Sequence, residues 1–171
     1  ILENPSIEKI GQNLKYDYIV LRSAGIRLAG IAFDTIVASY LLDAGSRNHT
    51  LDELARRYLQ HETIKINERI GSGKNQKRMD EVPVGQVAEY AAEDAIVPLW
   101  LKPILEKKLA ETELSELFRN VEMPLVEVLA ELEYLGIRID VARLRELSVR
   151  HAKRLLSLER EIFEIAGHEF N

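Results

Sequence analysis

Hydrophobic residues recur about every three to four positions through most of this chain, and this spacing predicts helices. Two short segments, residues 7–10 and 30–35, depart from that spacing and favour extended structure. The predicted helices cover residues 13–24, 34–43, 51–60, 84–110, 113–135 and 141–166. We therefore expect strands to alternate with helices in the first half of the chain and long helices to dominate from Pro83 onward.

Polar residues and glycine mark the ends of the first three predicted helices. Asn13 is a candidate N-cap for the first helix, and Gly25 suits the position just after its last turn. Asp34 stands where the second strand passes into a helix, and we expect it to cap that helix rather than bind a ligand. Thr50 is the expected cap of the third helix, and Glu53 would complete a capping box with it.

Residues 65–80 contain two glycines and five lysine or arginine residues, which predicts a mobile basic loop. A merely solvated loop and a loop that faces phosphate fit this composition equally well. A domain boundary is expected near residues 112–120, where the alternating pattern ends. The expected domains are residues 1–115 and residues 116–171.

Composition narrows the class of protein. A chain of 171 residues with 46% hydrophobic and 30% charged residues is typical of a soluble globular protein, and its apolar runs are too short to span a bilayer. The lack of cysteine excludes disulfides and thiolate metal sites, and the four histidines lack ligand spacing and are expected at the surface. The net charge of −5 excludes a uniformly basic nucleic-acid coat, but it is compatible with an enzyme that binds nucleic acid at an acidic metal site.

An acid lies on the apolar face of the first predicted helix. Advancing about 100° per residue from Leu14 groups Asp17 with Val20 and Leu21, so its carboxylate is expected to point inward. A buried carboxylate without a partner would be costly or would have a raised pKa. Asp17 therefore needs a partner that the local sequence does not identify.

The helix predicted over residues 84–110 repeats this arrangement. Asp94 shares a face with Val97 and stands one turn after Tyr90, whereas Glu93 is expected to face solvent. Two inward carboxylates on separate helices can converge on a divalent cation, because Mg²⁺ and Mn²⁺ favour oxygen ligands. Pairing with a buried arginine, or a helix rotation that hydrates the acid, is the more common solution, and the pattern alone does not choose.

Five stretches in order resemble the 3′–5′ exonuclease domain of bacterial family A DNA polymerases and its continuation toward the polymerase domain. They are IGQNLKYD (10–17), GIAFDT (30–35), LDELARRYL (51–59), YAAEDA (90–95) and VEMPLVEVLAELEYLGIRID (121–140). The resemblance covers essentially the whole chain. It implies an α/β fold that is RNase H-like, truncated and predominantly helical here, in a proofreading nuclease of DNA replication and repair.

The resemblance also implies a set of catalytic residues. In this family four carboxylates hold two divalent ions, Mg²⁺ or Mn²⁺, that activate a water for attack on the terminal phosphodiester. Asp17 and Asp94 match two of these catalytic metal ligands. Tyr90 matches a tyrosine that orients the attacking water.

The same resemblance implies contacts with DNA. Gln12, Asn13 and Tyr16 lie where the family binds a single-stranded 3′ end, and Arg47 or its neighbour Asn48 corresponds to a basic residue near the scissile phosphate. The product would be a deoxynucleoside monophosphate. The other implied partner is the remaining polymerase chain, in a bacterial cytoplasm near the nucleoid and away from membranes.

The first motif of the family, an Asp-x-Glu, is expected before Ile1, because no such triplet occurs in the first half of the chain. We therefore expect a fragment that holds two of the four metal carboxylates and has little or no activity by itself. An RNase D-like exoribonuclease shares the acid pattern, although residues 121–140 argue against it. A non-catalytic exonuclease domain that guides DNA is a further alternative, although every motif acid that the fragment could contain is present.

Overall fold

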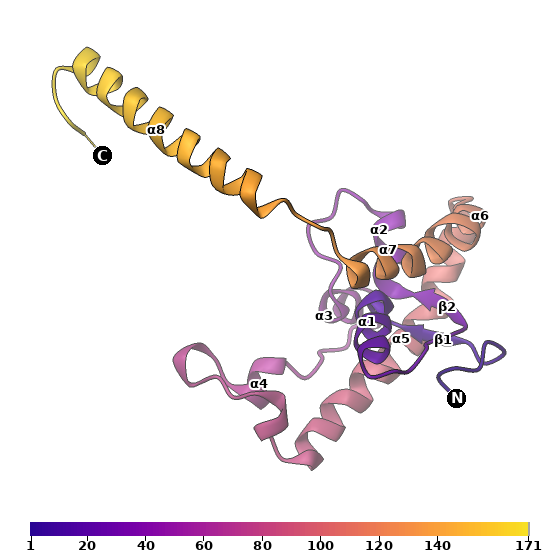
Figure 1. Cartoon of the computed structure of the whole chain (residues 1–171). Helices are drawn as coiled ribbons and strands as arrows, with labels where there is room; N and C mark the ends of the chain where they lie inside the picture. The colour runs from indigo at the N-terminus through magenta and orange to yellow at the C-terminus, as the bar shows by residue number, and fades with distance from the viewer. Residues whose placement is uncertain (171) are drawn as a thin grey trace. The chain divides into compact units, whose positions relative to one another are not determined.

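A computed structural model describes residues 1–170 (Figure 1). The chain divides into two compact units, residues 1–135 and the residues from Gly136 onward. The first unit holds a two-stranded sheet and most of the helices, and the second is built on a single long helix. This fold is predominantly helical, as the sequence predicts.

The sheet consists of two short parallel strands, β1 (Lys9–Gly11) and β2 (Ile31–Asp34). Helix α1 (Leu14–Ser23) connects them, as a parallel crossover requires. Both predicted strands are confirmed, with β1 shifted by about two residues toward α1. Gly25, in the left-handed region at φ 80°, follows the last turn of α1 as expected.

The carboxylate of Asp34 joins the ends of both strands to the helices that follow them. It accepts hydrogen bonds from the backbone N–H of Asn13 (3.1 Å), Leu14 (2.7 Å) and Ile36 (2.9 Å), and Asp34 is 1% exposed. Asp34 thus caps α2 (Thr35–Leu42) as predicted and also serves the start of α1. The predicted capping role of the Asn13 side chain is wrong: Asn13 precedes α1 in the left-handed conformation, and its side chain makes no capping bond.

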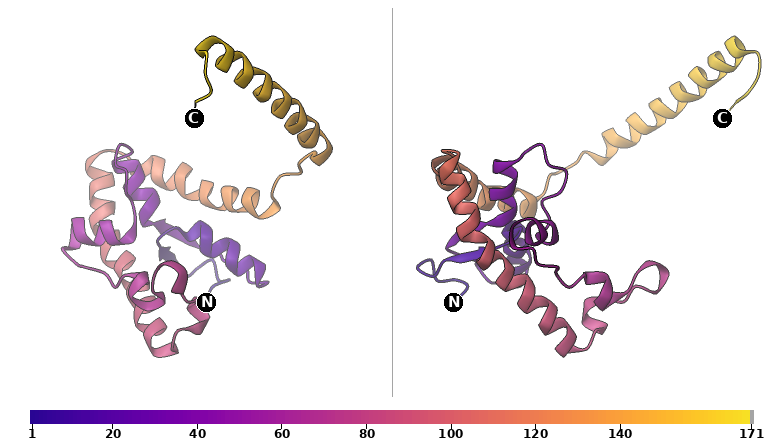
Figure 2. Two further views of the ribbon diagram at one scale, coloured as in Figure 1. Left: turned by 90° about the vertical axis from the view of Figure 1, so that its left-hand side faces the viewer. Right: turned by 180° about the vertical axis from the view of Figure 1, so that it is seen from behind.

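Helix α5 (Val84–Glu111) forms the centre of the apolar core and is the long pink helix in Figure 2. Four of its side chains, Val97, Leu101, Leu105 and Leu109, are buried completely or nearly so. They pack in one cluster with Phe33 of β2 and with Phe118, whose rings lie 4.9 Å apart. The core therefore holds α5 against the sheet and so fixes where the side chains of α5 project.

The third predicted helix is α3 (Leu51–Leu54), which continues into the π-helical turn η1 (Ala55–Leu59). Thr50 caps α3 by accepting the backbone N–H of Glu53 at 3.4 Å. The predicted capping box is wrong, because the Glu53 carboxylate accepts two hydrogen bonds from the Arg56 guanidinium instead. The backbone N–H of Thr50 donates to the Asn48 side chain.

Residues 65–80 are more ordered than a loop. They contain the short helix α4 (Ile66–Ile70) and the 3₁₀ turns η2 (Gly73–Asn75) and η3 (Met79–Glu81). Ile70 is buried, and Arg69 pairs with Glu89 of α5. The composition predicted a loop because charged residues dominate this segment, and it did not reveal that Ile70 is buried.

The remaining helices follow the predicted pattern. Helix α6 (Ser115–Leu117), the π-helical turn η4 (Phe118–Glu122) and α7 (Met123–Leu135) complete the first unit. The second unit contains α8 (Val141–Ala166), which Asp140 caps and Gly167 follows in the left-handed region. Among the described residues no helix is both long enough and apolar enough to cross a bilayer.

Replacement of Asp34 by alanine should strongly destabilise the first unit. Three backbone N–H groups would lose their acceptor, so we expect the free energy of unfolding to fall by about 3 kcal/mol. Urea denaturation followed by circular dichroism measures this change. Asp43→Ala is the matched control at the other end of α2, where an exposed ion pair with Arg57 should contribute about 0.5 kcal/mol or less. Equal effects of the two changes would contradict the role assigned to Asp34.

Candidate active site

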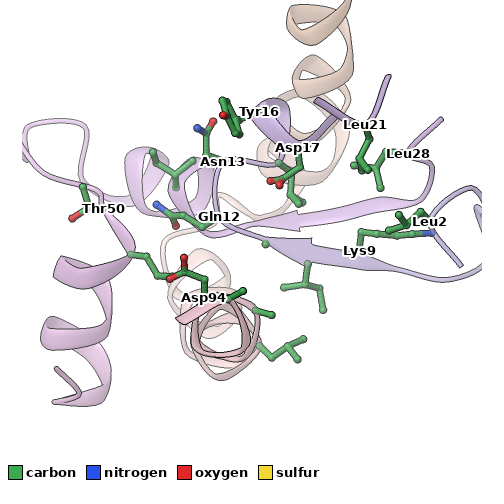
Figure 3. A pocket seen from close by; sticks show the side chains of 18 of the residues that line it. Leu2, Lys9, Gln12, Asn13, Tyr16, Asp17, Leu21, Leu28, Thr50 and Asp94 are labelled. Atoms are coloured by element: carbon green, nitrogen blue, oxygen red, sulfur yellow. The ribbon is translucent and has the colours of Figure 1, made fainter. Parts of the chain in front are cut away.

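A cleft of about 920 Å³ opens beside β1 and is lined by three acids from different helices, of which Figure 3 labels Asp17 and Asp94. Asp17 comes from α1, Asp52 from α3 and Asp94 from α5. Tyr90, one turn before Asp94, also lines the cleft. The two acids that the sequence analysis selected therefore share one cavity, although 77 residues separate them (94 − 17).

Asp17 lies on the face of α1 that lines the cleft, but it is exposed rather than buried. The expectation of a buried carboxylate is wrong, because the cleft is open at this side of the helix. Partial burial in the cleft still raises the pKa of Asp17, and the negative charge of Asp34 adds to the effect. A carboxylate that is accessible but incompletely hydrated is suited to bind a cation.

Asp94 and Tyr90 are half-buried and lie on the face of α5 that the sequence predicts. Burial is the main cause that raises the pKa of Asp94, and a hydrogen bond with Tyr90 opposes it. Burial and that same hydrogen bond raise the pKa of Tyr90 to about 12. The phenol is therefore a hydrogen-bond donor at neutral pH.

Glu93 does not face solvent, contrary to the prediction from the helix pattern. It is 15% exposed and accepts hydrogen bonds from the backbone N–H of Ile64 at 2.6 Å and from His61 Nε2 at 2.8 Å. The chain after η1 returns over α5 at this point and supplies both donors. His61 is thereby held in a structural contact and also packs edge-on to Trp100.

Asp52 is a cleft residue that the sequence analysis did not select. Its carboxylate accepts hydrogen bonds from Thr63 Oγ1 and Lys65 Nζ, both at 2.7 Å. Burial alone would raise the pKa of Asp52, but these two bonds lower it overall. The position of Asp52 in the first turn of α3 looks like ordinary helix capping, so the sequence carried no signal for its place in the cleft.

The residues expected to bind DNA occupy different environments. Asn13 and Tyr16 are exposed at the cleft, with Tyr16 65% exposed (Figure 3). The amide of Gln12 is already engaged: its Nε2 donates to the His49 carbonyl at 2.9 Å, and its Oε1 accepts from the Thr35 hydroxyl. Arg47 is exposed in the loop between α2 and α3 and is not among the residues that line the cleft.

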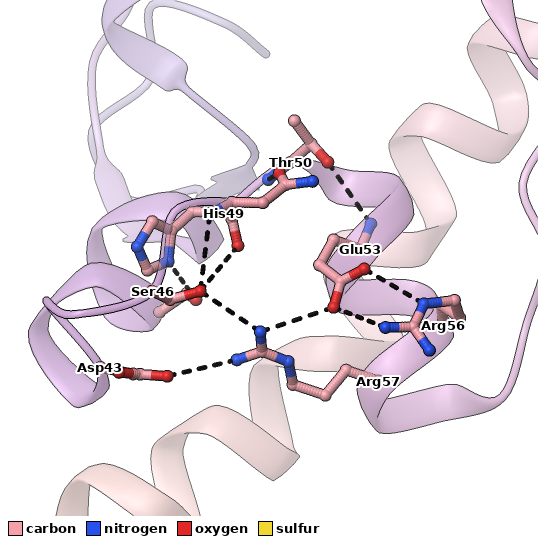
Figure 4. A network of polar contacts seen from close by, with 9 residues as sticks. Asp43, Ser46, His49, Thr50, Glu53, Arg56 and Arg57 are labelled. Carbon is pink, nitrogen blue, oxygen red and sulfur yellow. Dashed lines mark hydrogen bonds and ion pairs between the residues drawn. The ribbon is translucent and has the colours of Figure 1, made fainter.

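A polar network fixes the loop that carries Arg47 (Figure 4). The Arg57 guanidinium reaches Asp43, Ser46 and Glu53 with contacts of 3.4–3.6 Å. His49 is half-buried and its Nδ1 lies 2.8 Å from Ser39 Oγ, so its expected surface location is wrong. Together with the bond from Gln12 to the His49 carbonyl, this network connects the loop to the edge of the cleft.

Comparison with known proteins identifies the family. Residues 1–110 match a family model described as 3′-5′ exonuclease. The chain belongs to this 3′–5′ exonuclease family. The resemblance stated from five short motifs is thereby confirmed, whereas the roles of individual site residues stay predictions.

Curated relatives extend the similarity beyond residue 110. DNA polymerase I of Pseudomonas aeruginosa is 41% identical over 174 residues, which cover 100% of this chain and 19% of that protein. DNA polymerase I of Chloroflexus aurantiacus is 41% identical over 171 residues, which cover 98% of this chain and 18% of that protein. The chain thus spans about a fifth of the length of these relatives.

Solved structures support the same fold. The POL domain of Pol1 from M. smegmatis, in complex with DNA primer-template and dNTP, has a TM-score of 0.81 at 27% identity and covers 99% of this chain and 26% of that chain. NrnC of Brucella melitensis has a TM-score of 0.66 at 25% identity and covers 79% of this chain and 62% of that chain. The arrangement of helices around the short sheet is therefore that of this exonuclease family.

The donor set of the cleft fits a divalent cation in part. Asp17 and Asp94 present carboxylate oxygens of the kind that Mg²⁺ and Mn²⁺ prefer. Within residues 1–170, however, no group of three or more acid or histidine side chains stands close enough to hold an ion. These two acids therefore fit as ligands that need further oxygen donors, from substrate, water or other protein groups.

The raised pKa of Tyr90 predicts a specific dependence of stability on pH. A phenol whose pKa is about 12 when folded stabilises the fold fully below its ordinary pKa of 10.0, and this contribution is lost as the pH rises toward 12. Tyr90→Phe lacks that group, so the gap in unfolding free energy between wild type and variant should shrink from pH 10 to 12. Urea denaturation at several pH values measures the gap. Measurements at pH 8 are the control, and a gap that stays constant up to pH 12 would contradict the assigned environment.

Proposed function

We propose that this chain supplies part of the active centre of a proofreading enzyme of the DNA polymerase I type, which removes nucleotides from the 3′ end of DNA. The observation that supports this proposal most directly is the cleft itself. Asp17 and Asp94 line one cavity with Tyr90, and each comes from a motif that resembles the exonuclease family. The curated relatives named DNA polymerase I add support along the whole chain.

In this proposal Asp17 and Asp94 hold Mg²⁺ or Mn²⁺ together with donors that complete the site. Two such ions, when bound, would acidify a water and neutralise charge on the phosphodiester in the transition state. Tyr90 donates a hydrogen bond that orients the attacking water, which its protonated phenol can do throughout the neutral range. Each step ends with release of a deoxynucleoside monophosphate.

The substrate in this proposal is the frayed single-stranded 3′ end of a primer. Tyr16 offers an exposed aromatic face on which a base can stack, and Asn13 offers an amide for phosphate or sugar. Gln12 acts mainly by holding the His49 loop at the edge of the cleft. Arg47, on that loop, reaches the phosphate backbone once DNA is bound.

We further propose that residues 116–171 begin the polymerase domain of the longer protein. The 171-residue chain alone should show no measurable exonuclease activity, because two carboxylates bind a divalent ion weakly and cannot hold two ions in register. The likeness to NrnC, which has also been solved with Mg²⁺ and with pGG, favours an RNase D-like exoribonuclease as the second candidate. Equal cleavage of matched DNA and RNA 3′ ends would favour that alternative.

Asp17→Ala or Asp94→Ala, in the full-length protein that contains this chain, should lower exonuclease activity by at least about 100-fold, because each change removes a metal ligand. Polymerase activity should remain, since these acids lie in a different active centre. Mn²⁺-dependent release of the mismatched 3′ nucleotide from a labelled primer measures the first activity, and primer extension measures the second.

Glu111→Ala is the control for these two variants, because it removes an exposed acid at the end of α5 that does not line the cleft and, among the described residues, pairs only with the exposed Lys107. Tyr90→Phe should lower the rate while leaving Mn²⁺ binding intact. Full proofreading by Asp17→Ala would overturn the proposed site, and no exonuclease activity in the wild-type protein would support a non-catalytic domain.

A further inference from the structure

Helix α7 lies outside residues 1–110, the part that matches the exonuclease family, yet it packs along α1 (Figure 2). Ala130 of α7 is fully buried and forms a small apolar cluster with Tyr18 of α1 and with Leu28. Ile19 and Leu21 of α1 and Ile31 of β2 pack against this cluster. The helix that carries Asp17 therefore has its own core contact with α7, separate from the main core around α5.

Polar contacts reinforce this packing at one carboxylate. The Tyr18 hydroxyl donates to Glu131 Oε1 at 2.9 Å, and the guanidinium of Arg22 forms an ion pair with the same oxygen. Arg22 also lies over the ring of Tyr134, 4.1 Å from its centroid. Tyr18 is 8% exposed, so its hydrogen bond is sheltered from water, whereas the Arg22 and Glu131 side chains are 31% and 39% exposed and their ion pair is partly solvated.

The geometry of a helix links these contacts to Asp17. Tyr18 and Arg22 stand four residues apart on the face of α1 that meets α7, and Asp17 lies about 100° away around the axis. Asp17 lies in the first turn of α1, whose leading N–H groups Asp34 accepts, and Tyr18 is the next residue along the helix. The contacts of Tyr18 and Arg22 with Glu131 hold the middle and the end of α1 and so add a second restraint on the rotation of this helix.

We infer that α7 is a positioning element of the exonuclease site, in which Glu131, through Tyr18 and Arg22, sets the rotation of α1 and aims Asp17 into the cleft. This inference rests on the proposed role of Asp17 as a metal ligand. It extends the functional unit past the family-matched residues into the segment that leads toward the polymerase domain. Glu131 touches neither substrate nor ion in this scheme and acts only through α1.

Glu131→Ala in the full-length protein tests the inference, with Glu127→Ala as the matched control. Glu127 is one turn earlier on α7, is exposed, and makes no hydrogen bond or ion pair within residues 1–170. We expect Glu131→Ala to lower the exonuclease rate at limiting Mn²⁺ about tenfold and to raise the half-saturating Mn²⁺ concentration, because a misaimed ligand binds more weakly. Excess Mn²⁺ should restore much of the rate, and Glu131→Gln, which keeps an acceptor for Tyr18, should lose less.

A second measurement needs no metal and no activity. In the 171-residue chain with chelator present, Glu131→Ala and Tyr18→Phe should shift the amide NMR signals of α1, including that of Asp17, while those of α3 stay in place. The double variant should cause less than the sum of the two single effects, since both changes break one contact. Tyr18→Phe removes a single oxygen and provides the decisive comparison if Glu131→Ala lowers the folded fraction.

The outcomes separate this inference from the proposed function. If Glu131→Ala and Tyr18→Phe leave the rate, the Mn²⁺ dependence and the α1 signals unchanged while Asp17→Ala abolishes cleavage, then the positioning role is wrong and the proposed site stands. A loss of rate that excess Mn²⁺ does not restore, and that follows a loss of helix signal, also overturns the positioning role. If Asp17→Ala itself keeps full activity, the proposed function fails first.

Discussion

The buried carboxylate of Asp34 is the contact on which the arrangement of the cleft depends. This carboxylate accepts hydrogen bonds from backbone N–H groups at the start of α1 and in the first turn of α2. A single side chain therefore fixes the relative positions of these two helices and of the strands that precede them. A buried carboxylate is tolerated because several backbone dipoles replace its hydration. Asp17, in the first turn of α1, takes part of its position from this contact.

The cleft brings together negative charges that would separate if packing did not hold them. Partial burial is the main cause that raises the pKa of both Asp17 and Asp94, and the nearby charges of Asp34 at Asp17 and of Glu93 and Asp52 at Asp94 act in the same direction. This arrangement lowers the free energy of unfolding when no cation is present, and a bound cation raises it again. The core side chains of α5 and the network around Arg57 therefore support a site that is unfavourable by itself.

The sequence correctly predicted the features that depend on interactions between residues close together in the chain. Strand and helix positions, the cap at Asp34 and the shared face of Tyr90 and Asp94 follow from spacing within a few residues. Glu93 and Gln12 were misjudged or incompletely understood because their partners lie 23–37 residues away, on segments whose return path no periodicity encodes. His49 was misjudged because Ser39, ten residues earlier, meets its ring across the loop between α2 and α3. Asp52 was missed for a related reason, since its helix-start position gave it a sufficient local explanation.

The difference between local and long-range contacts also explains why the end of the residues that match the family need not be the end of the structure that supports the site. Helix α1 has 10 residues, too few for a stable helix in isolation, so its presence and rotation depend on tertiary contacts. One set of contacts comes from Asp34, inside the matched residues, and the other comes from α7, beyond them. A carboxylate on such a helix is aimed by both sets, so the residues that control its direction extend beyond the motif in which it is recognised.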